Sequence, residues 1–134
     1  MSKSKAKGTG AESAVVRYLQ AWWPAAERRA LSGNKDKGDI AGIYSVCIEV
    51  KAAERQLIGP WQRETLVEKE NAGATACVLV VKRPYKPVSQ WDAYMPARYT
   101  GPMLLKALRD GEGSTGWLRM DLALAAAVLR SQGY

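Results

Sequence analysis

Apolar residues in this chain come in short runs bounded by glycine, proline or polar residues, which is the pattern of short strands in a globular fold. The most strand-like run covers residues 74–81, and we expect it to be a central strand. Residues 38–51 predict two strands joined by a tight turn, with Gly42 in or near that turn. The other expected strands cover residues 26–31 and residues 91–95, the latter an edge strand that Pro96 ends.

Other segments repeat their apolar residues at helical spacing, so helices and strands are expected in mixed order. Val15, Leu19 and Trp22 form one such stripe. Charges in residues 60–71 mostly alternate in sign, which is typical of a solvent-exposed helix face. A stripe near the C-terminus, which packs on its own domain or on a second subunit, consists of Leu118, Leu122, Ala125 and Leu129. The expected helices are 10–23, which starts after Thr9 and which Pro24 ends, 60–71, 101–109 and, after a flexible linker at 111–116, 117–130.

The bulk composition limits the possible functions. The chain has 134 residues, enough for one domain with a core, and 47% of them are hydrophobic. Its net charge of +7 indicates a polyanionic partner, most simply nucleic acid. The absence of histidine excludes nucleases with a histidine base, Ser-His-Asp hydrolases and zinc sites with histidine ligands. Cys47 and Cys77 are expected to be buried free thiols, which fits a reducing cytoplasm, and no signal peptide or membrane span is recognisable.

Asp39, Glu49 and Lys51 are the candidate chemical residues. Side chains of a strand alternate between its faces, so Glu49 and Lys51 share one face, and a hairpin brings Asp39 beside them. Two carboxylates about 4 Å apart repel by roughly 4 kcal/mol at an effective dielectric constant of about 20. Mg²⁺ removes this conflict, since carboxylates, water and substrate phosphate are its usual ligands. Lys51 can then orient or help deprotonate the attacking water, or neutralise charge on a phosphate.

Each of these assignments has a simpler alternative, and the pattern alone leaves both open. A salt bridge from Lys51 to Glu49 or Asp39, on a half-exposed sheet, explains the same three residues. Residues 9–12 match a capping box, in which Glu12 bonds back to the amide of the cap residue. Alternatively, Glu12 faces Asp39 and Glu49 as a further ligand of the metal or of its water.

Basic and polar residues flank these candidates and are suited to contact a nucleic-acid backbone. Residues 1–8 form a basic tail that is expected to stay disordered until it meets phosphate, although a plain solvated tail explains it equally well. The polar loop 32–38 leads directly into Asp39. Asp36, the rival of Asp39, lies within this loop between lysines and is expected to be solvated. The expected DNA contacts are Lys5, Lys7, Arg28, Arg29, Ser32, Asn34, Lys35, Lys37, Lys82 and Arg83.

The order of these features resembles that of the archaeal-type Holliday-junction resolvases, which belong to the PD-(D/E)XK nuclease superfamily and also occur in bacteriophages. The resemblance covers about residues 3–83. Gly38 departs from the superfamily motif, which has proline there, and Gln62 is only a loose match for the archaeal glutamine on the second helix. The matching segments are 7–12, 28–33, 38–40, 48–51 and 71–83.

The resemblance implies a homodimeric endonuclease that uses Mg²⁺, with Mn²⁺ as a substitute, to hydrolyse one phosphodiester in each of two strands of a four-way DNA junction. Neither a membrane nor an organic cofactor is implied. By this resemblance Asp39, Glu49 and Glu12 hold the metal. Lys51 positions or activates the water, and Ser32 lies near the scissile phosphate.

The implied fold is α/β, with a restriction-endonuclease-like αβββαβ core in which helices flank a mixed central sheet, and a C-terminal helical extension. The expected organisation is a basic flexible tail (1–8), the nuclease core (9–98) and the extension (99–134), packed on the same domain or dimer. If phage-encoded, the protein is expected in the host cytoplasm.

Two other functions stay open. A PD-(D/E)XK nuclease that acts on duplex, flap or damaged DNA uses the same catalytic residues, because the choice of substrate shape depends on dimer geometry. A basic DNA-binding module with a decayed nuclease fold has no catalytic role. The intact set Glu12, Asp39, Glu49 and Lys51 argues against decay.

Overall fold

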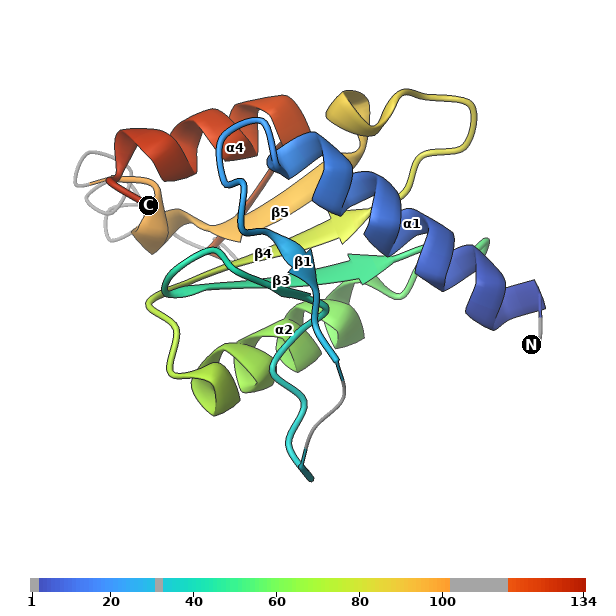
Figure 1. Cartoon of the computed structure of the whole chain (residues 1–134), viewed down its shortest axis with the longest axis horizontal. Coiled ribbons are helices and arrows are strands. Elements are labelled where there is room, and N and C mark those ends of the chain that lie inside the picture. Colours follow the sequence, from blue (N-terminus) through green and yellow to red (C-terminus); the bar gives the residue numbers. More distant parts are fainter. Residues whose placement is uncertain (1–2, 31–32, 102–115) are drawn as a thin grey trace.

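The structure is a computed structural model that describes residues 3–30, 33–101 and 116–134. Over these residues the chain forms one mixed sheet with helices on both faces (Figure 1), so the predicted α/β class is confirmed. None of the described helices has the length and apolar composition that a membrane span requires. The elements are α1 (Lys3–Leu19), β1 (Glu27–Arg28), β2 (Ile40–Ala41), β3 (Val46–Lys51), α2 (Ile58–Ala72), β4 (Ala76–Val81), η1 (Val88–Gln90), β5 (Asp92–Pro96), η2 (Ala97–Tyr99), β6 (Trp117–Asp121) and α4 (Leu122–Ser131).

The described strands follow their sequence order across the sheet, from β1 at one edge to β6 at the other. Neighbouring strands are antiparallel except β3 and β4, which are parallel and are connected through α2. In this parallel pair Cys47 lies opposite Cys77, and Lys51 lies opposite Val81. Both cysteines are buried and free, as predicted. The Lys82 N–H donates to the Lys51 carbonyl (2.9 Å), so the ends of β3 and β4 lie side by side.

The two faces of the sheet are covered differently (Figure 1). On one face α1 and α4 pack against Ile48 and Val50 of β3 in a large apolar core. On the other face lies α2, where Trp61 packs with Leu79 and Val81 of β4. Successive residues of β3 and β4 therefore enter different environments, because strand side chains alternate between faces.

Two glycines shape the hairpin of β2 and β3. Gly42 has φ +89° in the turn, as predicted, and a Cβ at this position would collide with the backbone of Ala25. Gly38 has φ +93°, and its Cβ would lie 2.9 Å from the Cys47 sulfur. Proline is fixed near φ −65° and cannot adopt this conformation. Glycine at the position where the resemblance expects proline is therefore a requirement of this backbone.

α1 extends further toward the N-terminus than predicted. It begins at Lys3, so the part of the predicted flexible tail from Lys3 to Gly8 is helical. The interpretation of residues 9–12 as a capping box is wrong, because Thr9 and Glu12 both lie inside the helix. No proline interrupts this segment, and its one alanine and three lysines favour helix. α1 also ends earlier than predicted, at Leu19, and β1 covers only two of the six residues predicted as a strand.

The C-terminal segment differs most from the prediction. Residues 117–121 are predicted as the start of a helix but form β6, which pairs with β5. The predicted edge strand β5 is therefore an interior strand of the described sheet. The final helix, α4, begins at Leu122, where the Asp121 side chain accepts a hydrogen bond from the Leu124 N–H (2.8 Å) and caps it.

The apolar stripe predicted for this segment is partly correct. Leu122, Ala125 and Leu129 are buried in the core that α1 and α4 share, so α4 packs on its own domain. Leu118, the fourth stripe residue, lies in β6. The predicted helix 101–109 and linker 111–116 fall almost wholly outside the described residues.

Candidate metal and nucleic-acid site

The hairpin register brings Asp39 beside Glu49. The Asp39 N–H donates to the Ile48 carbonyl (2.8 Å), and the Asp39 carboxylate oxygen Oδ2 accepts a hydrogen bond from the Val50 N–H (2.8 Å). Asp39 therefore spans Glu49, bonded to the backbone on both sides of it. Lys51 lies on the same face of β3 as Glu49, with 3.3 Å between its Nζ and the Glu49 Oε1. The three residues singled out in the sequence thus converge as the alternation and the hairpin predict.

The two carboxyls are in electrostatic conflict. Burial raises the pKa of Asp39 from its ordinary value of 3.8 to about 8; the neighbouring Glu49 carboxylate acts in the same direction, and the Val50 hydrogen bond opposes it. Burial also raises the pKa of Glu49 to about 9, with Glu68 adding to the rise and Lys51 opposing it. Near neutral pH this pair therefore favours a bound proton or a bound cation.

Lys51 connects β3 to α2. Its Nζ lies 3.1 Å from the Glu64 Oε1 on α2, in addition to its contact with Glu49. Burial lowers the pKa of Lys51, but the carboxylates of Glu49 and Glu64 outweigh this effect and leave the pKa raised. The same Nζ is 6.0 Å from the ring centroid of Trp61. The salt-bridge alternative for Lys51 and Glu49 is therefore present, and it coexists with the carboxylate cluster.

α2 adds two glutamates that the sequence analysis did not single out, Glu64 and Glu68. They are one helical turn apart and share a face. The prediction that the charged face of this helix is exposed to solvent is wrong for Glu68, whose exposed fraction is 1%. We define the α2 cluster as Asp36, Glu49, Glu64 and Glu68, whose ligand oxygens all lie within 4.8 Å of one another. Asp36 is exposed, as predicted, but it faces this cluster.

Asp36 makes one hydrogen bond within its loop and one to α2. Its Oδ1 accepts from the Gly38 N–H (2.9 Å), and its backbone carbonyl accepts from the Asn71 side chain (2.8 Å). The loop before β2 is thereby attached to α2 near the end of that helix.

Among the described residues, no donor reaches either carboxylate oxygen of Glu68 or the Oε2 of Glu49, although all three atoms are buried. Buried polar atoms nearly always have a partner, so an ion is a reasonable candidate for this role. Hard divalent cations bind carboxylate oxygens at about 2.0–2.6 Å, which puts opposite ligands about 4–5 Å apart. The α2 cluster therefore could hold Mg²⁺, Mn²⁺ or Ca²⁺ with small adjustments of its side chains.

Glu12 approaches the site from α1 but has a partner of its own. Its Oε2 lies 3.0 Å from the Nε of Arg28 on β1, and the two form an ion pair. Its charge also contributes to the raised pKa of Asp39, which puts it in electrostatic reach of that carboxyl. Glu12 as a metal ligand stays a prediction.

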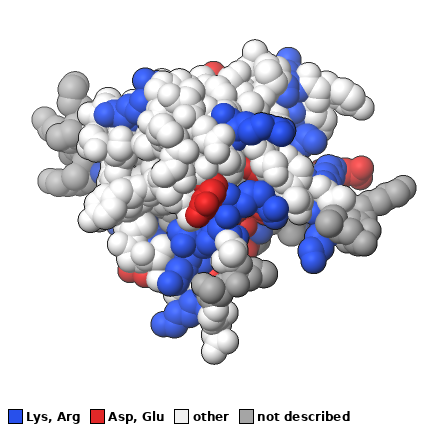
Figure 2. Space-filling view, viewed as in Figure 1, with Lys and Arg blue, Asp and Glu red and all other residues white. Residues whose placement is uncertain are grey.

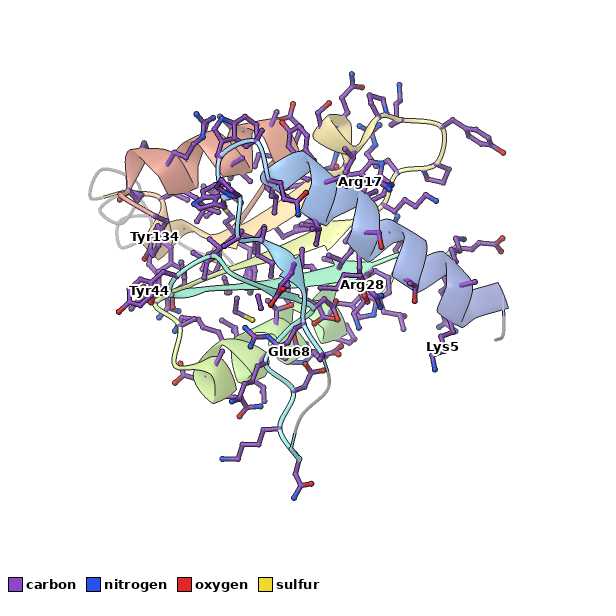
Figure 3. The ribbon with its side chains drawn as sticks, viewed as in Figure 1. Lys5, Arg17, Arg28, Tyr44, Glu68 and Tyr134 are labelled. Atoms are coloured by element: carbon purple, nitrogen blue, oxygen red, sulfur yellow. The ribbon has the colours of Figure 1, made fainter. Side chains whose placement is uncertain are left out.

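A cavity of about 310 Å³ adjoins Asp39 and Asp36. In Figure 2, Lys and Arg side chains surround a few acidic ones on the face of the molecule where β1 crosses the sheet. Figure 3 labels three residues of this region, Arg28 from β1, Glu68 from α2 and Lys5 from the start of α1. Arg29 lines the cavity with a buried Nε that has no hydrogen-bond partner in the described part of the chain. The lining residues are Lys5, Gly8, Thr9, Glu12, Arg28, Arg29, Ala30, Lys35, Asp36, Lys37, Gly38 and Asp39.

Of the remaining predicted DNA contacts, Lys7, Lys82 and Arg83 lie near the end of β4. Lys7 and Lys82 both line a second cavity of about 220 Å³. Lys82 also stacks over the Trp91 ring (5.8 Å), while an Arg83 Nη1 donates to the Gln90 carbonyl (3.5 Å). Asn34 is exposed in the loop before β2. Ser32 lies outside the described residues, so its predicted role stays a prediction.

Comparisons of the chain with models of protein families, with curated proteins and with solved structures gave no match. The function therefore has to be inferred from the geometry of the site and the chemistry of its residues.

Proposed function

We propose that this protein is a divalent-cation-dependent DNA endonuclease that cuts four-way junctions. The observation that carries the proposal is the convergence of Asp39, Glu49 and Lys51 next to a cavity with basic walls. A polyanion that enters this cavity meets Arg28, Arg29 and other cationic side chains, and it meets the cation-binding carboxylates at Asp39. Attraction for a phosphate and the means to hydrolyse it are thus found together.

The order of the elements supports the same proposal. α1 precedes three antiparallel strands, and α2 then leads to β4, which is parallel to β3. This order agrees with the αβββαβ order of a restriction-endonuclease-like core, which supports the fold that the resemblance to junction resolvases implies. The carboxylates and the lysine lie on or next to β2 and β3, as that resemblance implies.

In the proposed reaction, water attacks the phosphorus and loses a proton to solvent, while the bond to one sugar oxygen breaks and that oxygen takes up a proton. Asp39 and Glu49 would hold a divalent cation, which would supply Lewis acidity and offset charge on the phosphate. Lys51 donates hydrogen bonds that orient the water or stabilise the developing negative charge. The Val50 N–H fixes the orientation of the Asp39 carboxylate.

The basic residues contribute affinity without reading base sequence. Lys35 and Lys37 line the cavity beside Arg28 and Arg29, so the backbone of a branched DNA is the expected contact. Six to ten such contacts make affinity fall by roughly 10³ to 10⁵ between about 50 and 200 mM salt. A four-way junction has two equivalent strands to cut, and a symmetric homodimer offers two equivalent sites.

The deciding experiment incubates the protein with Mg²⁺ or Mn²⁺ and either a synthetic four-way junction or a linear duplex of the same sequence. We expect paired cuts in the junction and little cutting of the duplex. Asp39→Asn is expected to abolish cleavage while junction binding, measured in Ca²⁺, stays close to that of the wild type. Glu70→Gln is the matched control, because Glu70 is exposed on α2 and pairs only with Lys69 among the described contacts.

Other outcomes would reject parts of the proposal. Equal cutting of duplex and junction leaves a nuclease but removes the junction specificity. Binding without cutting of any branched or linear DNA indicates a non-catalytic DNA-binding module. Undiminished cutting by Asp39→Asn refutes the site itself.

A further inference from the structure

We propose that the α2 cluster is a second divalent-cation site. It shares the ligand Glu49 with the cation site proposed at Asp39, and its other ligands are Glu64, Glu68 and Asp36. The cation binding inferred here stands on geometry alone, whereas any part it plays in strand cleavage rests on the proposed function. The expected ligand is a hard cation such as Mg²⁺ or Mn²⁺, because all donors are carboxylate oxygens.

Two independent observations support this site. The first is the spacing of the four ligand oxygens, which lie within 4.8 Å of one another although they come from a loop, a strand and a helix. The second is the state of Glu68, which is 1% exposed and has no hydrogen-bond donor for either oxygen in the described part of the chain. A buried carboxylate in this situation costs free energy unless a cation or a proton compensates it.

Lys51 alone does not supply this compensation. Its ammonium contacts Glu49 and Glu64, at 3.3 and 3.1 Å, but no contact from it to Glu68 is present. Lys51 thus contacts two of the four carboxylates, and Glu68, the most buried of the four, is not one of them. The groups that face Glu68 are the carboxyls of Glu49, Asp36 and Glu64, so a cation among them satisfies several at once.

The position of Asp36 gives the second cation a structural role. Asp36 belongs both to the α2 cluster and to the wall of the cavity that Asp39 lines. A cation bound here connects α2 to the loop that carries Lys35 and Lys37, in addition to the hydrogen bond from Asn71. The cation would thereby fix the loop that contacts the phosphate backbone, and it would lie next to the reacting phosphate in the proposed nuclease.

The test is the number of Mn²⁺ ions bound per chain without DNA, measured by the loss of the free-ion signal in electron paramagnetic resonance. Wild type and the Glu70→Gln control are expected to bind two ions. Glu68→Gln and Asp39→Asn are each expected to retain one. Glu64 is partly exposed, so Glu64→Gln serves as a variant with little risk to folding, and it should weaken one of the two ions by at least about tenfold. Circular dichroism establishes that each variant is folded.

The two proposals can fail separately in this experiment. A single ion that persists in Glu68→Gln and disappears in Asp39→Asn overturns the second site and leaves the proposed nuclease site intact; Glu49 and Glu68 then share a proton. A single ion that disappears in Glu68→Gln and persists in Asp39→Asn supports the α2 cluster and removes the metal from Asp39. No bound Mn²⁺ in the wild type overturns the second site, and the cleavage assay then decides on the nuclease alone.

Discussion

Neighbouring residues of β3 enter two opposite environments. Ile48 and Val50 pack into the apolar core with α1 and α4, where burial itself is stabilising. Glu49 and Lys51 face α2, which adds the exposed Glu64 and the buried Glu68. Burial disfavours the charged forms of Glu49 and Glu68. One face of the strand thus stabilises the fold, and the other keeps carboxylates in a strained electrostatic state. The second face could hold a cation, and burial on the first face offsets the free-energy cost of its carboxylates.

The largest expected effect comes from the apolar face. Ile48→Ala should lower the free energy of unfolding by about 2–5 kcal/mol, because Ile48 is 2% exposed and the change leaves a cavity. The Mn²⁺ bound per folded molecule should not change, since the side chain points away from the carboxylates. Urea unfolding and a Mn²⁺ titration without urea measure the two quantities. Val67→Ala is the control: this valine is 59% exposed on α2 and should cost no more than about 0.5 kcal/mol.

The next residue of β3 should behave in the opposite way. Glu49→Gln should slow single-turnover cleavage of a junction by at least about 100-fold, or about 2.7 kcal/mol, because it removes a ligand common to both proposed cation positions. It should not lower the stability of the metal-free protein near neutral pH, since the raised pKa of Glu49, about 9, keeps this carboxyl protonated there and glutamine is uncharged as well. A variant that cuts normally, or that unfolds as readily as Ile48→Ala, would contradict the division between the two faces.

The sequence predicts this division for β3 but not for α2. Alternation along the strand and the hairpin register are local rules, and they are enough to bring Asp39, Glu49 and Lys51 together. Glu68 is missed because alternating charges on a helix usually indicate solvent, and only packing against the sheet decides which face is buried. One signal was available: Trp61, Thr65 and Glu68 recur at helical spacing, and all three are buried.

β6 is missed for a related reason. Leu118 continues the spacing of the α4 stripe, so the sequence favours one long helix, whereas pairing with β5 makes residues 117–121 a strand. This pairing is a tertiary interaction that local propensity does not contain. The capping residue Asp121 was the available signal, because an aspartate before an apolar periodic run is typical of a helix start.

Over a single pH unit a smaller effect is expected from pH, and it tests the carboxylate face as a whole. The pKa of Asp39 is raised from 3.8 to about 8 and that of Glu49 from 4.5 to about 9. A raised pKa in the folded state gives stability that is complete below the ordinary value and is lost as pH rises through the raised one. The metal-free protein should therefore lose stability between about pH 4 and pH 9, by at most about 1.4 kcal/mol per pH unit for each retained proton.

The absence of histidine makes this pH dependence easy to interpret, because no histidine titrates between those limits. Urea unfolding at several pH values in a chelator provides the measurement. Saturating Mg²⁺ should flatten the profile, since the cation replaces the protons, and Asp39→Asn should reduce its slope. A flat profile without metal would mean that the carboxyls ionise normally and that the proposed conflict is absent.

The smallest expected effect concerns the attachment of the loop to α2, which has no counterpart on the apolar face. Asn71→Ala removes the 2.8 Å hydrogen bond to the Asp36 carbonyl, an exposed interaction worth about 0.5–1.5 kcal/mol. Hydrogen exchange of residues 33–38 should speed up, and junction affinity should fall by about two- to tenfold, because Lys35 and Lys37 are then held less firmly. Gln132→Ala removes a similar bond from an exposed side chain to the Thr100 carbonyl (3.4 Å), and neither readout should change. Unchanged exchange in Asn71→Ala would mean that the loop keeps its place without α2, and the polar face would then be a binding site only.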